Sequence, residues 1–184
     1  MRLLSFLFLV IASALPGSIA SAQEAQKPPQ WYLDDIEFLT RDGGRWVASN
    51  AEYKGENDPM DAYVIEWEKG YAHSMTGRLY GVRDGEQTGD FWRMFQYWDP
   101  GKGEAVVTQF GFGGAIGLGR AWTEDGVNKS VQTFYAPDGG ISGVGHESAN
   151  PDADTHLTHS FDIVDDVWNP RRSYSWIRDK TATE

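Results

Sequence analysis

The four histidines of this chain are the side chains best suited to chemistry, because the sequence contains no cysteine. The absence of cysteine excludes thiol catalysis, thiolate metal sites and iron–sulfur clusters. His156 and His159 are three residues apart, a spacing that would let them share a metal ion on a helix. The segment Thr155–Val164 alternates like a β-strand instead, and a strand directs the two rings to opposite faces. We therefore expect two separate, structural histidines.

His159 is the more informative of the two, because it shares a strand face with Leu157, Phe161 and Ile163. An apolar face of this kind is expected to turn toward a core, where His159 either makes a structural hydrogen bond or contacts a ligand. The residues expected to line a ligand cavity are His159, Trp92, Met94, Phe110 and Trp176.

No catalytic set is evident in the rest of the sequence. The segment Gly140–Gly143 lacks the spacing of a nucleophile elbow, and no strand–turn–helix pattern follows it. The glycine-rich run Gln109–Gly119 neither matches a phosphate-binding loop nor leads into a helix. No pair of carboxylates is marked as acid and base. These observations favour a protein that is not an enzyme, and they identify neither a catalytic residue nor a metal ligand.

Composition and charge narrow the possible partners. The formal net charge is −11, which disfavours nucleic acid and anionic membranes as partners. The chain has 8 Trp, 8 Tyr and 9 Phe, enough large rings to build a core without disulfides. We therefore expect a small apolar molecule as partner, with no nucleic acid and no membrane insertion after signal cleavage.

The first residues have the pattern of a secretory signal. Arg2 precedes the apolar run Leu3–Ala14, and Ala20-Ser21-Ala22 is a small-residue cleavage site. The run is shorter than the roughly 20 residues of a membrane span. We expect residues 1–22 to be removed and the protein to be periplasmic or secreted; the alternative is an uncleaved N-terminal anchor.

The remainder is expected to be a disordered lead, 23–30, followed by one domain, 31–184. Trp31–Leu39 could form two helical turns, with Asp34, Asp35 and Glu37 in solvent. After it, short runs rich in aromatic and β-branched residues are separated by Gly, Pro, Asn and Asp. Strands are expected at Gly44–Tyr53, Ala62–Glu68, Ala72–Val82, Phe91–Trp98, Glu104–Phe112, Ala115–Thr123, Val127–Tyr135, Ile141–Ser148, Thr155–Val164 and Arg172–Lys180.

The short connections between these strands predict antiparallel neighbours, because a parallel crossover needs a dozen or more residues. About ten such strands avoid exposed edges by closing on themselves. The sequence therefore predicts an all-β, up-and-down barrel with a short N-terminal helix. A barrel of more than about eight strands leaves interior space for a ligand.

Several short motifs resemble the lipocalin-like (calycin) β-barrel superfamily between Trp31 and Lys180. They are Phe38-Leu39 before Gly44-Arg45-Trp46, the hairpin Tyr97-Trp98-Asp99-Pro100, and Tyr174-Ser175-Trp176-Ile177-Arg178. Within the superfamily the chain looks most like exported bacterial barrel proteins of unknown function, and it is more distantly similar to the haem-binding nitrobindin barrels.

The resemblance implies that Gly44, Trp46 and Arg178 close one end of the barrel. We expect Trp46 to plug that end and the guanidinium of Arg178 to lie on its ring, a contact worth roughly 0.5–2 kcal/mol. The alternative is a solvated charge at the end of the last strand. In the haem-binding barrels an inward histidine ligates iron, so the resemblance makes His159 a candidate ligand and haem a possible cofactor.

Three functions remain open from the sequence. The first, which we favour, is a non-catalytic barrel that binds a small hydrophobic or amphipathic molecule in a cavity lined by rings. The second is an isomerase- or cyclase-like enzyme, which would need a buried carboxylate or histidine with a shifted pKa beside the cavity. The third is a structural or interaction barrel filled by its own side chains.

Overall fold

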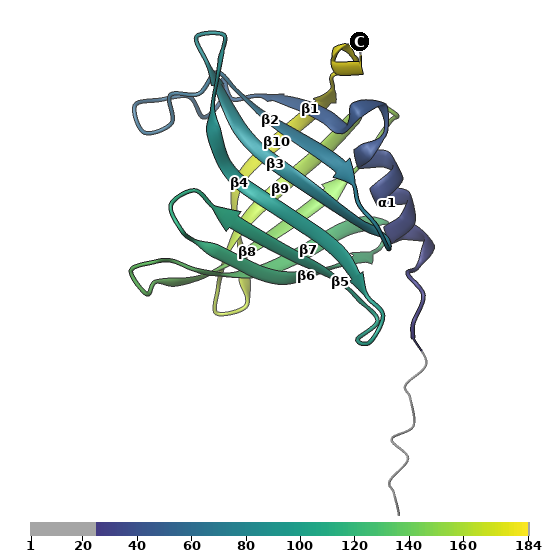
Figure 1. Ribbon diagram of the computed structural model, residues 1–184. Helices are drawn as coiled ribbons and strands as arrows, with labels where there is room; N and C mark the ends of the chain where they lie inside the picture. The colour runs from purple at the N-terminus through teal and green to yellow at the C-terminus, as the bar shows by residue number, and fades with distance from the viewer. Residues whose placement is uncertain (1–24, 184) are drawn as a thin grey trace, which may run out of the picture.

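The structure of this protein, a computed structural model, describes residues 25–183. They form a closed barrel of ten antiparallel strands with one α-helix across one end (Figure 1). The predicted all-β, up-and-down fold is thus confirmed. The expected signal peptide, 1–22, lies outside the described residues. Within 25–183, no helix is long and apolar enough to span a membrane.

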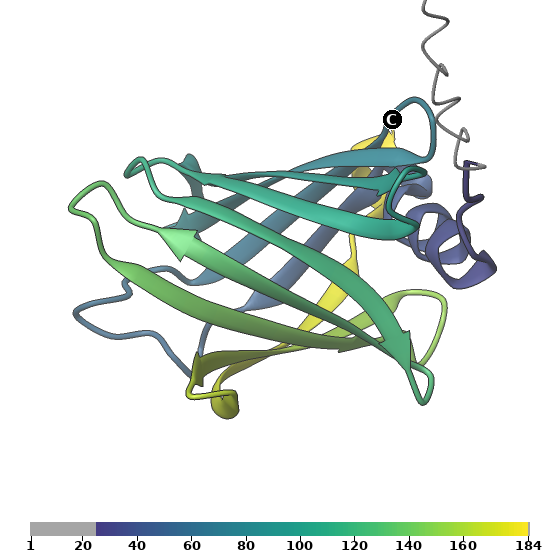
Figure 2. The ribbon, with the colours of Figure 1, turned by 90° about the horizontal axis from the view of Figure 1, so that it is seen from below.

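Each strand pairs with its neighbours in sequence, and β1 pairs with β10 to close the barrel. Figure 2 shows α1 (Gln30–Thr40) at one end of the barrel and a set of hairpin loops at the other. The 3-10 turns are η1 (Asp42–Gly44) and η2 (Lys180–Thr183). The strands are β1 (Arg45–Ser49), β2 (Ala62–Lys69), β3 (Ser74–Arg83), β4 (Glu86–Asp99), β5 (Glu104–Gly111), β6 (Ile116–Glu124), β7 (Val127–Tyr135), β8 (Ile141–Ala149), β9 (Thr155–Val164) and β10 (Val167–Arg178).

Two-residue turns with left-handed backbone join several of the strands. Asp84 and Gly85 between β3 and β4 have φ values of 54° and 80°, and Asp125 and Gly126 between β6 and β7 have 51° and 79°. Paired positive φ values match the right-handed twist of the flanking strands, and Asp-Gly accepts them readily. These turns hold the register of the hairpins that carry the interior residues.

Two strands begin earlier than expected. β4 begins at Glu86 and not at Phe91, and β10 begins at Val167 and not at Arg172. β10 follows a tight turn at Asp165 and Asp166, whose φ values of 50° and 62° are adopted without glycine. Pro170 lies where the β9–β10 register shifts, a position at which a strand tolerates proline.

The lead into the helix is held against the β4–β5 turn in its described part. The backbone N–H of Gln26 donates to the Pro100 carbonyl at 2.9 Å, and the Trp98 indole donates to the Gln26 carbonyl at 2.7 Å. The part of the expected lead that the structure describes therefore contacts the β4–β5 turn at two points.

Alternate residues of each strand point into the barrel, and small residues there make space for large ones. On β4, Trp92, Met94 and Gln96 face inward while Arg93 and Phe95 face outward. On β3, a Cβ at Gly77 would lie 2.6 Å from the Trp67 ring, so the glycine lets that indole lie flat against the inner wall.

The helix closes one end of the barrel with its apolar side. Tyr32, Ile36 and Leu39 of α1 are buried against Trp46 of β1 and Met75 of β3. The indole N–H of Trp46 donates to the Leu39 carbonyl at 2.9 Å. The interior cavity is therefore covered at this end by packed side chains.

Arg178 fastens the helix to the barrel. Its guanidinium lies 4.0 Å from the centroid of the Trp46 ring, and its side chain is 0% exposed. It donates to the carbonyls of Arg41 at 2.9 Å and Phe38 at 2.8 Å, just where α1 ends. The expected contact between Trp46 and Arg178 is present, and the solvated alternative does not apply. Nearby, Gly44 has φ 63°, and a Cβ there would collide with the Trp67 carbonyl.

We predict that Arg178→Ala lowers the free energy of unfolding by about 3 kcal/mol, because it leaves buried carbonyls at the helix end without donors. Urea unfolding monitored by circular dichroism measures the loss. Arg171→Ala, which removes an exposed arginine of the same strand, is the matched control and should change stability by less than about 0.5 kcal/mol. Equal stability of Arg178→Ala and the wild type would contradict the role given to Arg178.

Candidate functional site

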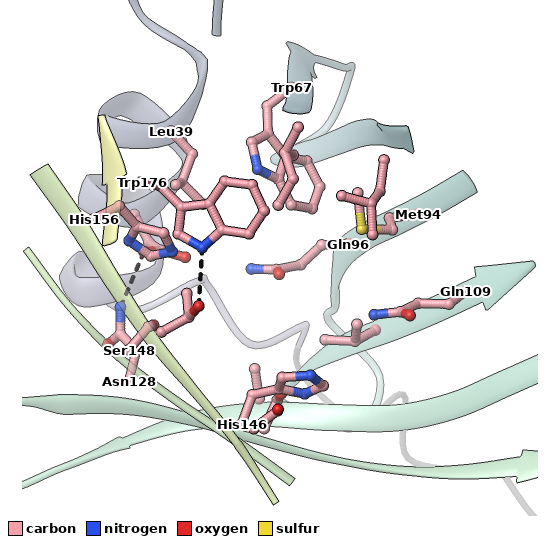
Figure 3. Close-up of a pocket in the computed structure, with 18 of the residues that line it drawn as sticks. Leu39, Trp67, Met94, Gln96, Gln109, Asn128, His146, Ser148, His156 and Trp176 are labelled. Carbon is pink, nitrogen blue, oxygen red and sulfur yellow. Dashed lines mark hydrogen bonds between the residues drawn. The ribbon is translucent and has the colours of Figure 1, made fainter. Parts of the chain in front are cut away.

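The barrel interior contains a cavity of about 300 Å³, lined by α1 and by every strand except β1 (Figure 3). Helix α1 closes it at one end. Toward the loop end it continues into a space of about 600 Å³, and Leu79, Trp92 and His146 line both. The barrel is thus a cup with one closed end and one open end.

One wall of the cup is apolar and largely aromatic. β2 to β4 and β10 supply its members, and Figure 3 shows Trp67 and Trp176 together on this side. The indole N–H of Trp176 donates to Thr158 Oγ1 at 2.9 Å, which fixes the ring plane. This wall comprises Ile65, Trp67, Leu79, Trp92, Met94 and Trp176.

The opposite wall is polar and mostly uncharged. β5 and β7 to β9 supply amide, hydroxyl and imidazole groups, and Figure 3 shows the Gln96 amide of β4 reaching between the two walls. Neutral groups of this kind can orient a ligand through hydrogen bonds without a charge partner. This wall comprises Gln109, Asn128, Ser130, Gln132, His146, Ser148, His156, Thr158 and Ser160.

Two glutamines on the polar wall contact each other. Gln109 Nε2 donates to Gln132 Oε1 at 3.1 Å. Gln132 is 1% exposed, and its Nε2 has no hydrogen-bond partner among the described residues. An unpaired buried amide costs stability, so this Nε2 is a group that a ligand acceptor could satisfy.

Two histidines face the cavity in their neutral form. Burial lowers the pKa of His146 to about 4, and the nearby charge of Arg171 adds to the effect. Burial likewise lowers the pKa of His156 to about 4, with a further contribution from Arg178. His156 Nδ1 lies 2.6 Å from Asn150 Oδ1, so that nitrogen carries the proton and donates it. At neutral pH both imidazoles act as uncharged hydrogen-bonding groups.

Asp35 brings a carboxyl group to the closed end. It lies on the buried side of α1 with Ile36 and Leu39, and it is 9% exposed. Asn128 Nδ2 donates to Asp35 Oδ1 at 2.9 Å. Burial raises the pKa of Asp35 to about 6, although hydrogen bonds from Gln96 and Asn128 oppose the rise. Asp35 was expected in solvent, and the structure corrects this.

A polar cluster lies at the open end. Arg172 pairs with Asp58 and donates to the Tyr174 hydroxyl at 3.1 Å. Tyr63 donates to Asp58 Oδ1 at 2.7 Å. Although burial raises the pKa of Asp58, hydrogen bonds from Tyr63 and Arg172 lower it overall. The loop that carries Asp58 is thereby tied to β10 beside the opening.

The structure places three of the five expected cavity residues together. Trp92, Met94 and Trp176 line the cup, whereas His159 and Phe110 lie on the outer wall. His159 is exposed, with Nδ1 2.7 Å from Ser173 Oγ. Phe110 is 44% exposed and packs edge-to-face on Phe95. Their expected inward placement is corrected.

The physical reason for this correction is visible on β9. Its polar residues His156, Thr158 and Ser160 face the cavity, and its apolar residues face outward. The expectation had assigned the apolar face to the interior, which is the usual arrangement when no polar cavity is present. The separation of His156 and His159 onto opposite faces is as expected.

Several cavity residues were not among those expected: Asp35, Gln96, Gln109, Gln132 and His146. A partial signal exists in Asn128-x-Ser130-x-Gln132, where three polar residues share one strand face. That alternation identifies a polar face but does not say that the face is inward.

The interior does not fit a haem held by His159, because that ring is on the outer wall. Within the described residues, no group of three or more His, Cys, Asp or Glu side chains could hold a metal ion. His146 remains as a cavity-facing imidazole, and one imidazole does not define a metal site.

We predict that Asp35→Asn stabilises the protein at pH 7.5 by about 1–3 kcal/mol. A folded pKa of about 6, above the unfolded value of 3.8, means that stability falls as the pH rises from 4 to 6. The substitution removes this penalty, so the gain should vanish at pH 4. Thermal unfolding of both proteins across this pH range measures it. A gain that is the same at pH 4 and pH 7.5 would contradict the burial of the charge.

His146 should have the opposite pH dependence. Its folded pKa of about 4 lies below the unfolded value of 6.5, so stability falls as the pH decreases through this interval. We predict that His146→Gln recovers about 2 kcal/mol at pH 5 relative to pH 7.5, as measured by urea unfolding at the two pH values. A wild-type-like pH profile in His146→Gln would show that folding does not lower the pKa of His146.

Comparison with known proteins gives no significant match to a family model, to a curated protein or to a solved structure. The features that bear on function are therefore those of the cup: its two unlike walls, its neutral histidines and the carboxyl group of Asp35 at the closed end.

Proposed function

We propose that this protein binds one small amphipathic molecule inside the barrel. The observation that carries the proposal is the division of the cup into an aromatic wall and a neutral polar wall. A molecule with a flat apolar body and several polar groups could satisfy both walls at once. The aromatic wall would contribute most of the affinity, and the amide, hydroxyl and imidazole groups would fix the orientation.

The size of the cavity favours a ligand over a barrel filled by its own side chains. About 300 Å³ is within the range of small-molecule sites and well above the volume of one water molecule. The large rings lie against the wall, as Trp67 does over Gly77, and leave the centre open. A filled structural barrel would be expected to pack these rings across its centre.

The proposed setting is an exported, non-catalytic barrel of the lipocalin-like type. Support for the family comes from the up-and-down closure and from the contact between Trp46 and Arg178. Support for a periplasmic or secreted location comes from the signal-like pattern of residues 1–22. A small molecule in place of nucleic acid is consistent with the net charge of −11.

Asp35 favours a second candidate function, catalysis in the same cup. A buried carboxyl group with a pKa of about 6 can exchange protons near neutral pH, as a general acid or base must. If the cup is catalytic, Asp35→Asn protein should retain unconverted substrate, whereas the wild type should hold product or nothing. A bound compound with the same mass and the same chromatographic retention in both proteins, which excludes an isomer, favours the binding function.

We predict that native mass spectrometry of the wild-type protein detects an extra mass of a few hundred daltons that is released on denaturation. Met94→Trp should abolish this mass by filling the cup, because Met94 is 7% exposed and faces the cavity. Phe95→Trp places the same ring one residue away on the outer wall and should retain the mass.

Circular dichroism of both variants checks that the barrel remains folded. Retention of the bound mass in folded Met94→Trp would place the ligand outside the cup. The absence of any bound mass in the wild type, together with no uptake of added amphipathic probes, would remove the proposed function.

A further inference from the structure

Asp35 is buried and, unlike the partly buried carboxylates Asp58 and Glu66, has no cationic partner among the described residues. Asp58 pairs with Arg172, and Glu66 pairs with Arg45 and Arg78. Among the described residues, no Lys, Arg or His lies within ion-pair distance of Asp35. A buried charge without a partner is costly, so this carboxylate lacks a compensating group that a ligand could supply.

Neutral amides hold the carboxylate in place without using up its acceptors. Asn128 Nδ2 donates at 2.9 Å, and Gln96 donates as well. A carboxylate has about four lone-pair positions, so two such bonds leave room for further donors. The amide oxygens of Gln96 and Asn128 can accept from the same ligand group. Together these atoms suit a group with several N–H donors.

The rings at this end of the cup also suit a cation. Trp31 and Trp176 line the cavity with Asp35, and Trp is the side chain whose face attracts cations most strongly. The net charge of −11 raises the local concentration of cations around the protein. At the open end, Arg172 is paired with Asp58 and Arg171 with Asp162, so neither charge is left unmatched against the entry of a cation.

We propose that the ligand of this barrel carries a protonated amine, which binds Asp35 at the closed end while its apolar body lies against Trp67, Trp92 and Met94. This inference rests on the proposed function, since it names the polar group of the molecule that the cup takes up. It commits to an amphipathic amine and excludes a carboxylic acid, which would bring a second negative charge to Asp35. The pKa of Asp35, about 6, keeps its carboxyl group ionised at pH 7.5.

Three probes with one apolar body test the choice of head group: 4-phenylbutylamine, 4-phenylbutan-1-ol and 4-phenylbutyrate. Isothermal titration calorimetry of purified wild-type protein at pH 7.5 gives the three affinities. We expect the amine to bind about tenfold or more tightly than the alcohol, and the carboxylate to bind least tightly. Equal affinities of the amine and the alcohol would overturn the inference.

A pair of matched variants tests whether Asp35 causes the preference for the amine. Asp35→Asn should bring the affinity for the amine down to that of the alcohol and leave the affinity for the alcohol unchanged. Asp34→Asn removes the same charge from the adjacent, exposed residue of α1 and should preserve the preference. A preference that survives in Asp35→Asn, or that is lost equally in Asp34→Asn, would show that general charge attraction produces it.

The outcome also separates this inference from the proposed function. If the alcohol binds wild-type protein and loses its affinity in Met94→Trp, the cup is a binding site even when the amine shows no advantage. In that case only the amine assignment fails. If neither the amine nor the alcohol binds, the proposed function and the amine assignment both fail.

Discussion

The buried guanidinium of Arg178 is the interaction on which the closed end of this barrel depends. It lies on the ring of Trp46 and binds the carbonyl groups of Phe38 and Arg41, where the helix ends. Because the last carbonyls of a helix have no partner within the helix, a fixed donor there decides where the helix stops and what it packs against. The same contact joins the first and last strands, since Trp46 and Arg178 are paired across β1 and β10.

Closure of the barrel at one end determines which interior polar groups are shielded from solvent. Helix α1 seals one end of the cup with packed side chains, so polar groups at that end are removed from bulk water. Burial accordingly keeps His156 neutral and raises the pKa of Asp35, both beside the helix. At the open end, Asp58 keeps a lowered pKa because Tyr63 and Arg172 supply donors. Burial and the available hydrogen-bond and charge partners together set the protonation of these groups.

The sequence was sufficient to predict the barrel but not to orient every strand. Turn residues and strand-length runs placed all ten strands, and Val127–Tyr135 and Thr155–Val164 have the expected bounds. Alternation shows which residues of a strand share a face, yet the choice of inward face depends on what the other strands contribute. His159 illustrates the difficulty, because its apolar neighbours suggested a core position and its strand turns its polar face inward. The expectation followed the usual rule that a strand turns its apolar face inward, and a polar cavity reverses that orientation.

Asp35 shows what the helix pattern could have revealed and what it could not. Trp31, Asp35 and Leu39 are four residues apart, which puts all three on one face of α1, while Asp34 turns to solvent. Helical spacing therefore contained the information that Asp35 follows the buried face. Helical spacing could not reveal that the amides of Asn128 and Gln96 lie beside this carboxylate, because they come from β7 and β4. These amides make a buried carboxylate tolerable. Helix α1 contributes this carboxyl group to the closed end of the cup, and two distant strands supply its neutral donors. In the proposed binding function, this arrangement would determine which end of an amphipathic ligand points inward.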